Sequence, residues 1–93
     1  MDSMMKSETT VKAEVIGSYQ EESRRGYLVC LSIAQGRTHV MYLESGEEWE
    51  TAELCSDPVM AHECFCRAWD GGLSPNHLKN FCEDEKKRLE IFQ

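Results

Sequence analysis

The segment YLVCLSIAQGRTHVMYL, residues 27–43, decides the fold of this chain. In residues 27–34 large apolar side chains occupy every second position. One face carries Tyr27, Val29, Leu31 and Ile33, and the other carries Leu28, Cys30 and Ser32. Because the side chains of a strand point alternately to its two faces, this period of two predicts a strand. Residues 38–43 repeat the alternation, and the Gln35-Gly36 turn between the two segments predicts an antiparallel hairpin.

Further strands are predicted on both sides of this hairpin. Residues 11–19 are rich in aliphatic side chains, whereas residues 20–25 are charged and polar, which indicates a loop. After the Ser45-Gly46 turn, residues 47–54 alternate and are predicted to form an edge strand, although their glutamates weaken that prediction. We therefore expect a small antiparallel sheet of three to four strands.

Two helices are predicted after the strands. In residues 57–70 apolar side chains recur at helical spacing, with Ser56 as the N-cap and Gly71-Gly72 at the end. Ser74-Pro75 begins a second helix that runs to about residue 89. Its narrow apolar face carries Leu78, Phe81, Cys82, Glu85 and Leu89. Since neither the helices nor a small sheet is stable alone, we expect an α+β fold in which a two-helix hairpin packs on one face of the sheet.

Length and composition limit the classes of function. The chain has 93 residues, and we assign residues 1–10 to a flexible leader and residues 11–93 to a single domain. Its net charge of −7 is expected to repel the phosphates of DNA and RNA. It contains no apolar run near the length of a membrane span, and its five cysteines argue against a disulfide framework. We expect a cytoplasmic protein that contacts neither nucleic acid nor membrane directly.

Acidic residues concentrate in the middle of the chain. Between Glu44 and Asp70, eight carboxylates accompany a single base, Arg67, so this segment alone has a net charge of −7. We expect these carboxylates to form one exposed face that a basic protein surface recognises. Trp49 either anchors the partner or packs on the sheet. The predicted partner-binding residues are Glu44, Glu47, Glu48, Trp49, Glu50, Glu53 and Asp57.

Cysteines and histidines suggest an alternative, a zinc-stabilised module. His62 and Cys66 are spaced i, i+4 on the first predicted helix, and His77 or Cys82 would complete the site from its neighbour. The chain contains no Cys-x-x-Cys pair, and Cys82 matches an apolar helix face, which favours buried cysteines over metal ligands. We therefore expect no cofactor. A domain of this size rarely encloses a catalytic pocket, so we also expect no enzymatic activity.

The last third of the chain contains Leu73-Ser74-Pro75-Asn76-His77-Leu78, followed by Cys82-Glu83-Asp84. This ending resembles that of a small clostridial-type domain family of unknown function, whose members combine a short strand pair, a helix, a Ser-Pro-x-His-Leu turn and an acidic closing helix. The resemblance implies that residues 27–33 match the first core strand of that family and that Ser56-Asp57 matches its helix cap. It implies a fold and no activity, and residues 38–54 and the segment after Asp84 depart from the family pattern.

In size and charge the chain is also similar to phage-encoded inhibitors of bacterial defence, including anti-CRISPR proteins. That similarity implies a non-enzymatic protein that mimics nucleic acid and blocks a basic site on a nucleic-acid-processing protein. A further alternative is a bacterial regulatory or structural domain that forms a homodimer. In it Leu89, Ile91 and Phe92 pack either against a second copy or on the chain's own core.

Overall fold

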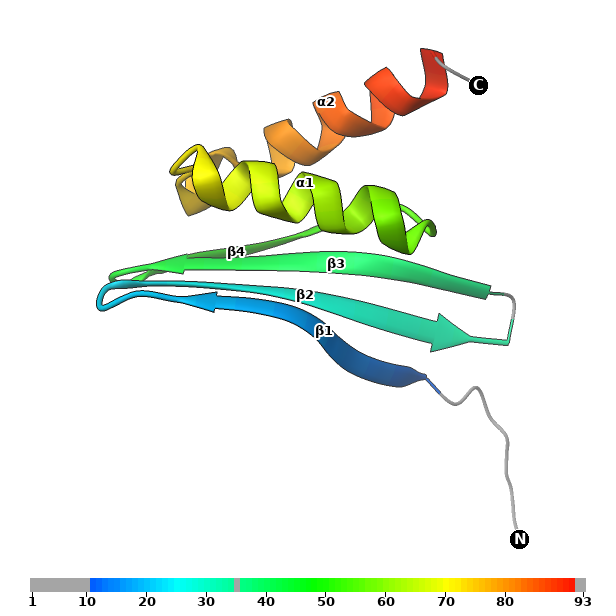
Figure 1. The fold of residues 1–93 in the computed structure, drawn as a ribbon, viewed down its shortest axis with the longest axis horizontal. Helices are drawn as coiled ribbons and strands as arrows, with labels where there is room; N and C mark the ends of the chain where they lie inside the picture. Colours follow the sequence, from blue (N-terminus) through cyan, green and yellow to red (C-terminus); the bar gives the residue numbers. More distant parts are fainter. Residues whose placement is uncertain (1–10, 35, 92–93) are drawn as a thin grey trace, which may run out of the picture.

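The computed structural model describes residues 11–34 and 36–91, with the backbone alone for residues 89–91. Four strands form one antiparallel sheet in the order β1-β2-β3-β4, and both α-helices lie on the same side of it (Figure 1). The elements are β1 (Lys12–Gln20), β2 (Arg24–Ile33), β3 (Gly36–Ser45), β4 (Glu48–Glu53), α1 (Pro58–Asp70), the 3₁₀ helix η1 (Pro75–His77) and α2 (Leu78–Ile91). The predicted α+β fold, with its helices on one face of the sheet, is confirmed. The leader predicted for residues 1–10 lies outside the described residues.

The loop between β1 and β2 is shorter than the sequence predicts. β2 begins at Arg24, which pairs with Ser45 of β3, and Arg25 pairs with both neighbouring strands. The loop predicted over residues 20–25 is therefore wrong in extent, and only residues 21–23 lie between the strands. The backbone N–H of Glu21 donates to the carbonyl of Arg24 (2.7 Å) and closes this turn.

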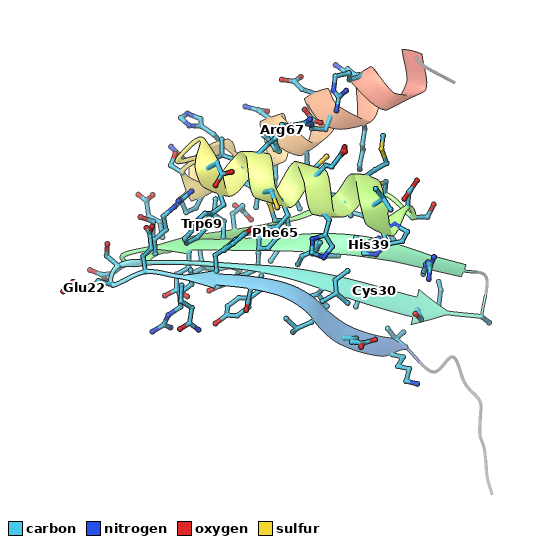
Figure 2. All side chains as sticks on the ribbon, viewed as in Figure 1. Glu22, Cys30, His39, Phe65, Arg67 and Trp69 are labelled. Atoms are coloured by element: carbon cyan, nitrogen blue, oxygen red, sulfur yellow. The ribbon has the colours of Figure 1, made fainter. Side chains whose placement is uncertain are left out.

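Two glycines let α1 approach the sheet closely. A Cβ added at Gly26 of β2 would lie 3.1 Å from the Trp69 ring and 3.2 Å from the Phe65 ring. At Gly17 of β1 it would lie 3.2 Å from the same Phe65 ring, next to a β-bulge between Val15 and Gly17. Both aromatic side chains point from α1 toward the sheet (Figure 2). The glycines therefore mark the positions where the helix rests on the strands.

The hydrophobic core lies between the sheet and the helices. Its buried apolar residues are Leu28, Met41, Leu43 and Leu54 from the strands and the segment after them, and Ala61, Cys64, Phe65, Ala68, Leu78 and Cys82 from the helices. Each is at most 4% exposed. Since burying a large apolar side chain stabilises the fold by about 1.5–3 kcal/mol, this single layer is the main source of stability.

His39 is buried in the same layer and fixes the connection from β4 to α1. Its side chain is 1% exposed, and Nδ1 donates to the carbonyl of Cys55 (2.8 Å). The backbone N–H of His39 donates to the same carbonyl (2.9 Å), and the N–H of Leu54 donates back to the carbonyl of His39 (2.8 Å). The polypeptide therefore leaves the sheet at a defined point.

The N-cap of α1 is Asp57, and the prediction of Ser56 is wrong. The Asp57 carboxylate accepts hydrogen bonds from the backbone N–H groups of Val59 (2.9 Å) and Met60 (3.4 Å). Asp and Ser cap helices about equally well, and the negative charge of Asp also favours the positive end of the helix dipole. Pro58 follows at the first helical position, where its missing N–H has no helical partner to lose.

Arg24 of β2 holds the opposite end of α1. Its guanidinium donates to the carbonyls of Trp69 (3.0 Å), Leu73 (3.1 Å) and Ala68 (3.4 Å), and it lies 4.0 Å from the centre of the Trp69 ring. The carbonyls of Ala68 and Trp69 belong to the last turn of α1, where they also accept the N–H groups of Leu73 and Gly72, and Leu73 lies in the segment that follows the helix. The helix stops at Asp70, as the Gly71-Gly72 pair predicts.

Glu85 joins α2 to α1. Its carboxylate accepts hydrogen bonds from Arg67 and from the Cys64 thiol (3.3 Å) on α1, and from Arg88 on α2 (2.7 Å). Burial opposes the charge of Glu85, but these donors and the charge of Arg67 hold the pKa of its carboxyl below the ordinary value. A charged contact therefore supplements the apolar packing between the helices.

The apolar face of α2 is partly confirmed. Leu78 and Cys82 are buried and Phe81 is half-buried, whereas the side chains of Leu89 and Ile91 and the whole of Phe92 lie outside the described residues. Within the described part of the chain, neither α-helix is long and apolar enough to cross a membrane.

Candidate protein-binding surface

One face of the sheet points away from α1 and α2, and none of the described elements covers it (Figure 1). Because cross-strand partners share a face, the strand register identifies its residues. We call this surface the open face. It comprises Ala13, Val15, Ser18 and Gln20 of β1, Arg25, Tyr27, Val29, Leu31 and Ile33 of β2, Thr38, Val40, Tyr42 and Glu44 of β3, and Trp49, Thr51 and Glu53 of β4.

The centre of the open face is apolar. Val29, Leu31 and Val40 line a shallow hollow of about 490 Å³ together with the tyrosines of β2 and β3. Toward the margins, Val15 is 58% exposed and Ile33 is 43% exposed. Side chains project from this side of the sheet into solvent (Figure 2). A continuous apolar surface that spans several strands is unusual for a soluble monomer and typically marks an interaction site.

A row of aromatic residues crosses the open face from β2 to β4. The ring centres of Tyr27 and Tyr42 are 5.8 Å apart, and those of Tyr42 and Trp49 are 6.1 Å apart with nearly parallel planes. Trp49 nevertheless remains 62% exposed. Both alternatives considered for Trp49 are therefore compatible, because its indole packs on the sheet and most of its surface stays accessible.

The open face is nearly neutral. It carries one base, Arg25, and two acids, Glu44 and Glu53, which gives one minus two, a net charge of −1 out of the −7 of the whole chain. Arg25 and Glu44 are cross-strand neighbours whose Nη1 and Oε2 atoms are 3.9 Å apart. The Tyr42 hydroxyl donates to Glu44 (2.6 Å), and this hydrogen bond raises the pKa of Tyr42. The acidic excess of the chain therefore lies elsewhere on the molecule.

The predicted acidic residues do not form one face. Glu44, Trp49 and Glu53 lie on the open face, whereas Glu48 and Glu50 project to the helix side of the sheet. The cause is the alternation of side chains along a strand, which separates neighbours in the sequence. The expectation of one continuous acidic surface is therefore wrong for Glu44 and Glu53. The other predicted residues around the β3–β4 turn, Glu47, Glu48, Trp49 and Glu50, line one hollow with Pro75 and Asn76.

The other predicted acidic residues, Glu47, Glu50 and Asp57, differ in their local surroundings. Glu50 lies 3.6 Å from Nζ of Lys79 on α2, which offsets its charge. Asp57 is engaged as the N-cap of α1, and Glu47 lies in the turn that precedes β4. Glu50 therefore lies on the helix side of the sheet and Asp57 at the start of α1, whereas Glu44 and Glu53 lie on the open face.

The structure does not bring the zinc-candidate residues together. His62 and Cys66 lie side by side on α1, where the Cys66 thiol is 3.2 Å from the Tyr19 hydroxyl. His77 is exposed in η1, whereas Cys82 is buried under α2. In residues 11–34 and 36–91, no group of three His, Cys, Asp or Glu side chains is placed to hold a metal ion.

The buried thiols belong to the core. Burial raises the pKa of Cys64 to about 12, and its hydrogen bond to Glu85 acts in the same direction. Burial also raises the pKa of Cys82 to about 12. A thiol acts as a nucleophile only when it is deprotonated, so these two cysteines behave as small apolar residues at neutral pH.

Comparison with protein-family models, curated proteins and solved structures found no match to this chain. The resemblance of residues 73–84 to the clostridial-type family and the similarity to anti-CRISPR proteins therefore stay predictions. What the fold and the surface define is a class: a small α+β domain whose helices cover one face of a four-stranded sheet and leave an apolar face exposed.

Sequence reasoning missed the open face, although a signal for it is present. A strand with one solvated face normally alternates between apolar and polar residues. β2 and β3 depart from this rule, since Val29 and Val40 on one face oppose Leu28 and Met41 on the other. Two helices of this length cover only one face, so the pattern indicates a second apolar face that none of the elements in residues 11–34 and 36–91 buries.

Proposed function

We propose that this chain is a protein-binding module without enzymatic activity and that the open face is its binding surface. The observation that supports the proposal is an apolar surface, centred on Val29 and Val40, that the helices of the chain leave exposed. Removing apolar surface from water is the dominant driving force of most protein association. Tyr and Trp, which form the row across this face, are also the residues enriched at binding hot spots.

The open face favours a partner surface that is apolar rather than basic. Its net charge is only −1, and its two acids lie at its margins: Glu44 at the end beside Arg25, and Glu53 on the edge strand β4. A basic partner is expected only if the carboxylates form one surface. The alternation of side chains along β4 instead places Glu48 and Glu50 on the opposite side of the sheet from Glu53. The nucleic-acid mimic therefore gains no support from this arrangement, and an inhibitory role stays a prediction.

Trp49 is proposed as a preorganised contact at the margin of the binding surface. Its stacking on Tyr42 limits the orientation of the indole before any partner arrives. Ordering a side chain at an interface costs about 0.5–1.5 kcal/mol, so a residue that is already ordered binds with a smaller entropic loss.

The proposal is tested by site-specific photo-cross-linking. p-Benzoylphenylalanine replaces Val40 at the centre of the open face in one variant and Val59, which is 66% exposed on α1, in the control. Both variants are irradiated as purified protein and in an extract of the source cells. We expect polypeptide adducts from position 40 only. Equal labelling from both positions, or no adduct from position 40 in either setting, would contradict the proposed surface.

A further inference from the structure

We propose that the occupant of the open face is a second copy of this chain, so that two sheets pack face to face in a symmetric dimer. This inference rests on the proposed function, because it names the partner of the same surface. Two properties of the open face support it: the pattern of its side chains matches itself under one particular two-fold axis, and its area is close to what a specific interface needs.

The matching axis runs parallel to the strands and passes between β2 and β3, midway between the two sheets. Rotation about it places β2 above β3 of the second copy and keeps each residue at its own level along the strands. Residues that are cross-strand partners within one sheet therefore face each other between the two copies. Because Val29 pairs with Val40 in the β2–β3 register, Val29 faces Val40 of the second copy, and an apolar centre forms.

The charged end of the open face is complementary under the same axis. Arg25 and Glu44 are register partners, so Arg25 of each copy faces Glu44 of the other. Arg25 has 55% of its side chain exposed, and Glu44 has 30% exposed, so both can reach a second partner. Glu44 is also held in place by the Tyr42 hydroxyl (2.6 Å). The dimer would thus convert two separate ion pairs into a network of four charges.

Other charged and aromatic groups on the open face are compatible with this arrangement. Glu53 faces Val15 of the second copy at the margin, where water still reaches its carboxylate. Tyr27 faces Tyr42 of the second copy, so the aromatic row is doubled. The two copies of Glu53 lie at opposite edges, which keeps these like charges apart.

The alternative two-fold axis, perpendicular to the strands, is disfavoured. It would place β2 above β2 of the second copy with the ends reversed. With the axis at the level of Val29, Arg25 would then face Ile33 of the other copy. Burying a guanidinium against an aliphatic side chain without a carboxylate is costly, so charge selects the parallel axis.

The area of the open face agrees with a dimer of modest affinity. The four strands are spaced about 4.8 Å apart, which gives the open face a width of about 19 Å. Along the strands, the residues from Arg25 to Leu31 rise about 3.3 Å each, which gives a length of about 23 Å. This is roughly 440 Å² in plan for each copy, and projecting side chains enlarge the accessible area. The plan area of the two copies is about 880 Å², and the projecting side chains bring the buried accessible area toward the lower end of the roughly 1,200–2,000 Å² that specific interfaces bury. Packed sheets of this kind lie about 10 Å apart.

The test combines sedimentation equilibrium with charge reversal on the full chain. The wild type is expected to show a monomer–dimer equilibrium with a dissociation constant in the micromolar range. R25E and E44R each place like charges opposite each other across the interface and are expected to raise this constant at least tenfold. An equimolar mixture of the two variants should recover a heterodimer, since the acidic pair of R25E and the basic pair of E44R face each other only between different chains.

E50K serves as the matched control, because it reverses a carboxylate on the helix side of the same sheet. It is expected to leave the monomer–dimer equilibrium unchanged, and circular dichroism verifies that all variants fold. A strict monomer at several hundred micromolar would overturn the dimer, and so would a dimer that responds to E50K but not to R25E or E44R. Failure of the mixed variants to associate would also overturn it.

The cross-linking experiment separates failure of the dimer from failure of the binding surface. An adduct from position 40 in the purified protein, with the mass of two chains, supports the dimer. An adduct with a different polypeptide, formed only in the extract while the chain sediments as a monomer, overturns the dimer and leaves the proposed function intact. An open face that yields no adduct in either setting contradicts both.

Discussion

The contact between Arg24 and the end of α1 offers the sharpest test of how the helices are held on the sheet. Arg24→Ala removes the hydrogen bonds to the carbonyls of Trp69 (3.0 Å) and Leu73 (3.1 Å), the longer one to Ala68, and the stacking on the Trp69 ring. The backbone of the sheet is left intact. We therefore expect a loss of stability without a change of strand pairing.

The magnitude follows from the parts of this contact. Each of the two short hydrogen bonds contributes about 1 kcal/mol net, since water can reach these half-buried carbonyls in the variant. The cation–π contact adds about 0.5–1 kcal/mol. The expected loss is about 2–3 kcal/mol, and about 4–8 °C per kcal/mol in a domain of this size gives a fall in Tm of roughly 10 °C or more. Arg24→Lys keeps the charge but lacks the planar guanidinium that donates to several carbonyls at once. We therefore expect it to lose about half as much stability as Arg24→Ala.

Urea unfolding followed by circular dichroism measures these changes. Arg25→Ala is the matched control at a protein concentration well below the dissociation constant of the proposed dimer. It removes the neighbouring arginine, whose ion-pair partner within the chain is the partly exposed carboxylate of Glu44. Such a surface ion pair contributes about 0–1 kcal/mol. If Arg24→Ala destabilised the domain no more than Arg25→Ala does, the assignment of Arg24 as the residue that holds α1 would be refuted.

Three further predictions follow from the core and the helix contacts. Iodoacetamide is expected to alkylate Cys66 in the native protein at about pH 8 while sparing Cys64 and Cys82, whose raised pKa keeps them protonated; peptide mapping by mass spectrometry checks this, and early labelling of Cys82 would contradict it. Glu85→Gln is expected to lower the free energy of unfolding by about 1 kcal/mol near pH 7, since its arginine partners are about half exposed. The folded-state pKa of Glu85 is lowered, so its contribution is complete above the unfolded carboxyl pKa and disappears as the pH falls through the folded value. Urea titrations from about pH 7 to about pH 3 should therefore show the wild type and the variant converging, whereas parallel curves would count against this role. Gly26→Ala is expected to destabilise the domain by about 1–2 kcal/mol, because the new Cβ meets the packed rings of Phe65 and Trp69, and a Tm at or above that of the wild type would disprove this steric role.

The strand pattern of the sequence was sufficient to predict the sheet because the pattern is local. Alternation in residues 27–43 specifies both strands and the turn between them, and it does so without reference to the rest of the chain. The N-cap of α1 was wrong by one residue for a non-local reason. Ser56 and Asp57 are both good caps, and the choice depends on where the chain leaves the sheet, which the buried contact of His39 with Cys55 determines.

The candidate site could not be predicted from proximity in the sequence. Glu48 and Glu50 lie next to Trp49 along the chain, but the strand places them on the opposite side of the sheet. The contact of Arg24 with Trp69 joins residues 45 positions apart, and no periodicity indicates it. The open face can be inferred only by comparing the apolar faces of the sheet with the surface that the helices can cover. Both sides of β2 are apolar, and the two helices that follow it suffice to cover one of them.

The meander order of the sheet has a consequence for synthesis on the ribosome. Each strand pairs with the strand that follows it in the sequence, so the sheet can assemble while the chain is still being made. The helices follow the strands in the sequence, and a nascent chain that has emerged only as far as Cys55 presents apolar side chains on both sides of its strands. A small sheet without a covering layer is marginally stable, and exposed apolar strands favour aggregation. The interval before α1 leaves the exit tunnel is therefore the stage at which the apolar faces of this sheet are most exposed to aggregation.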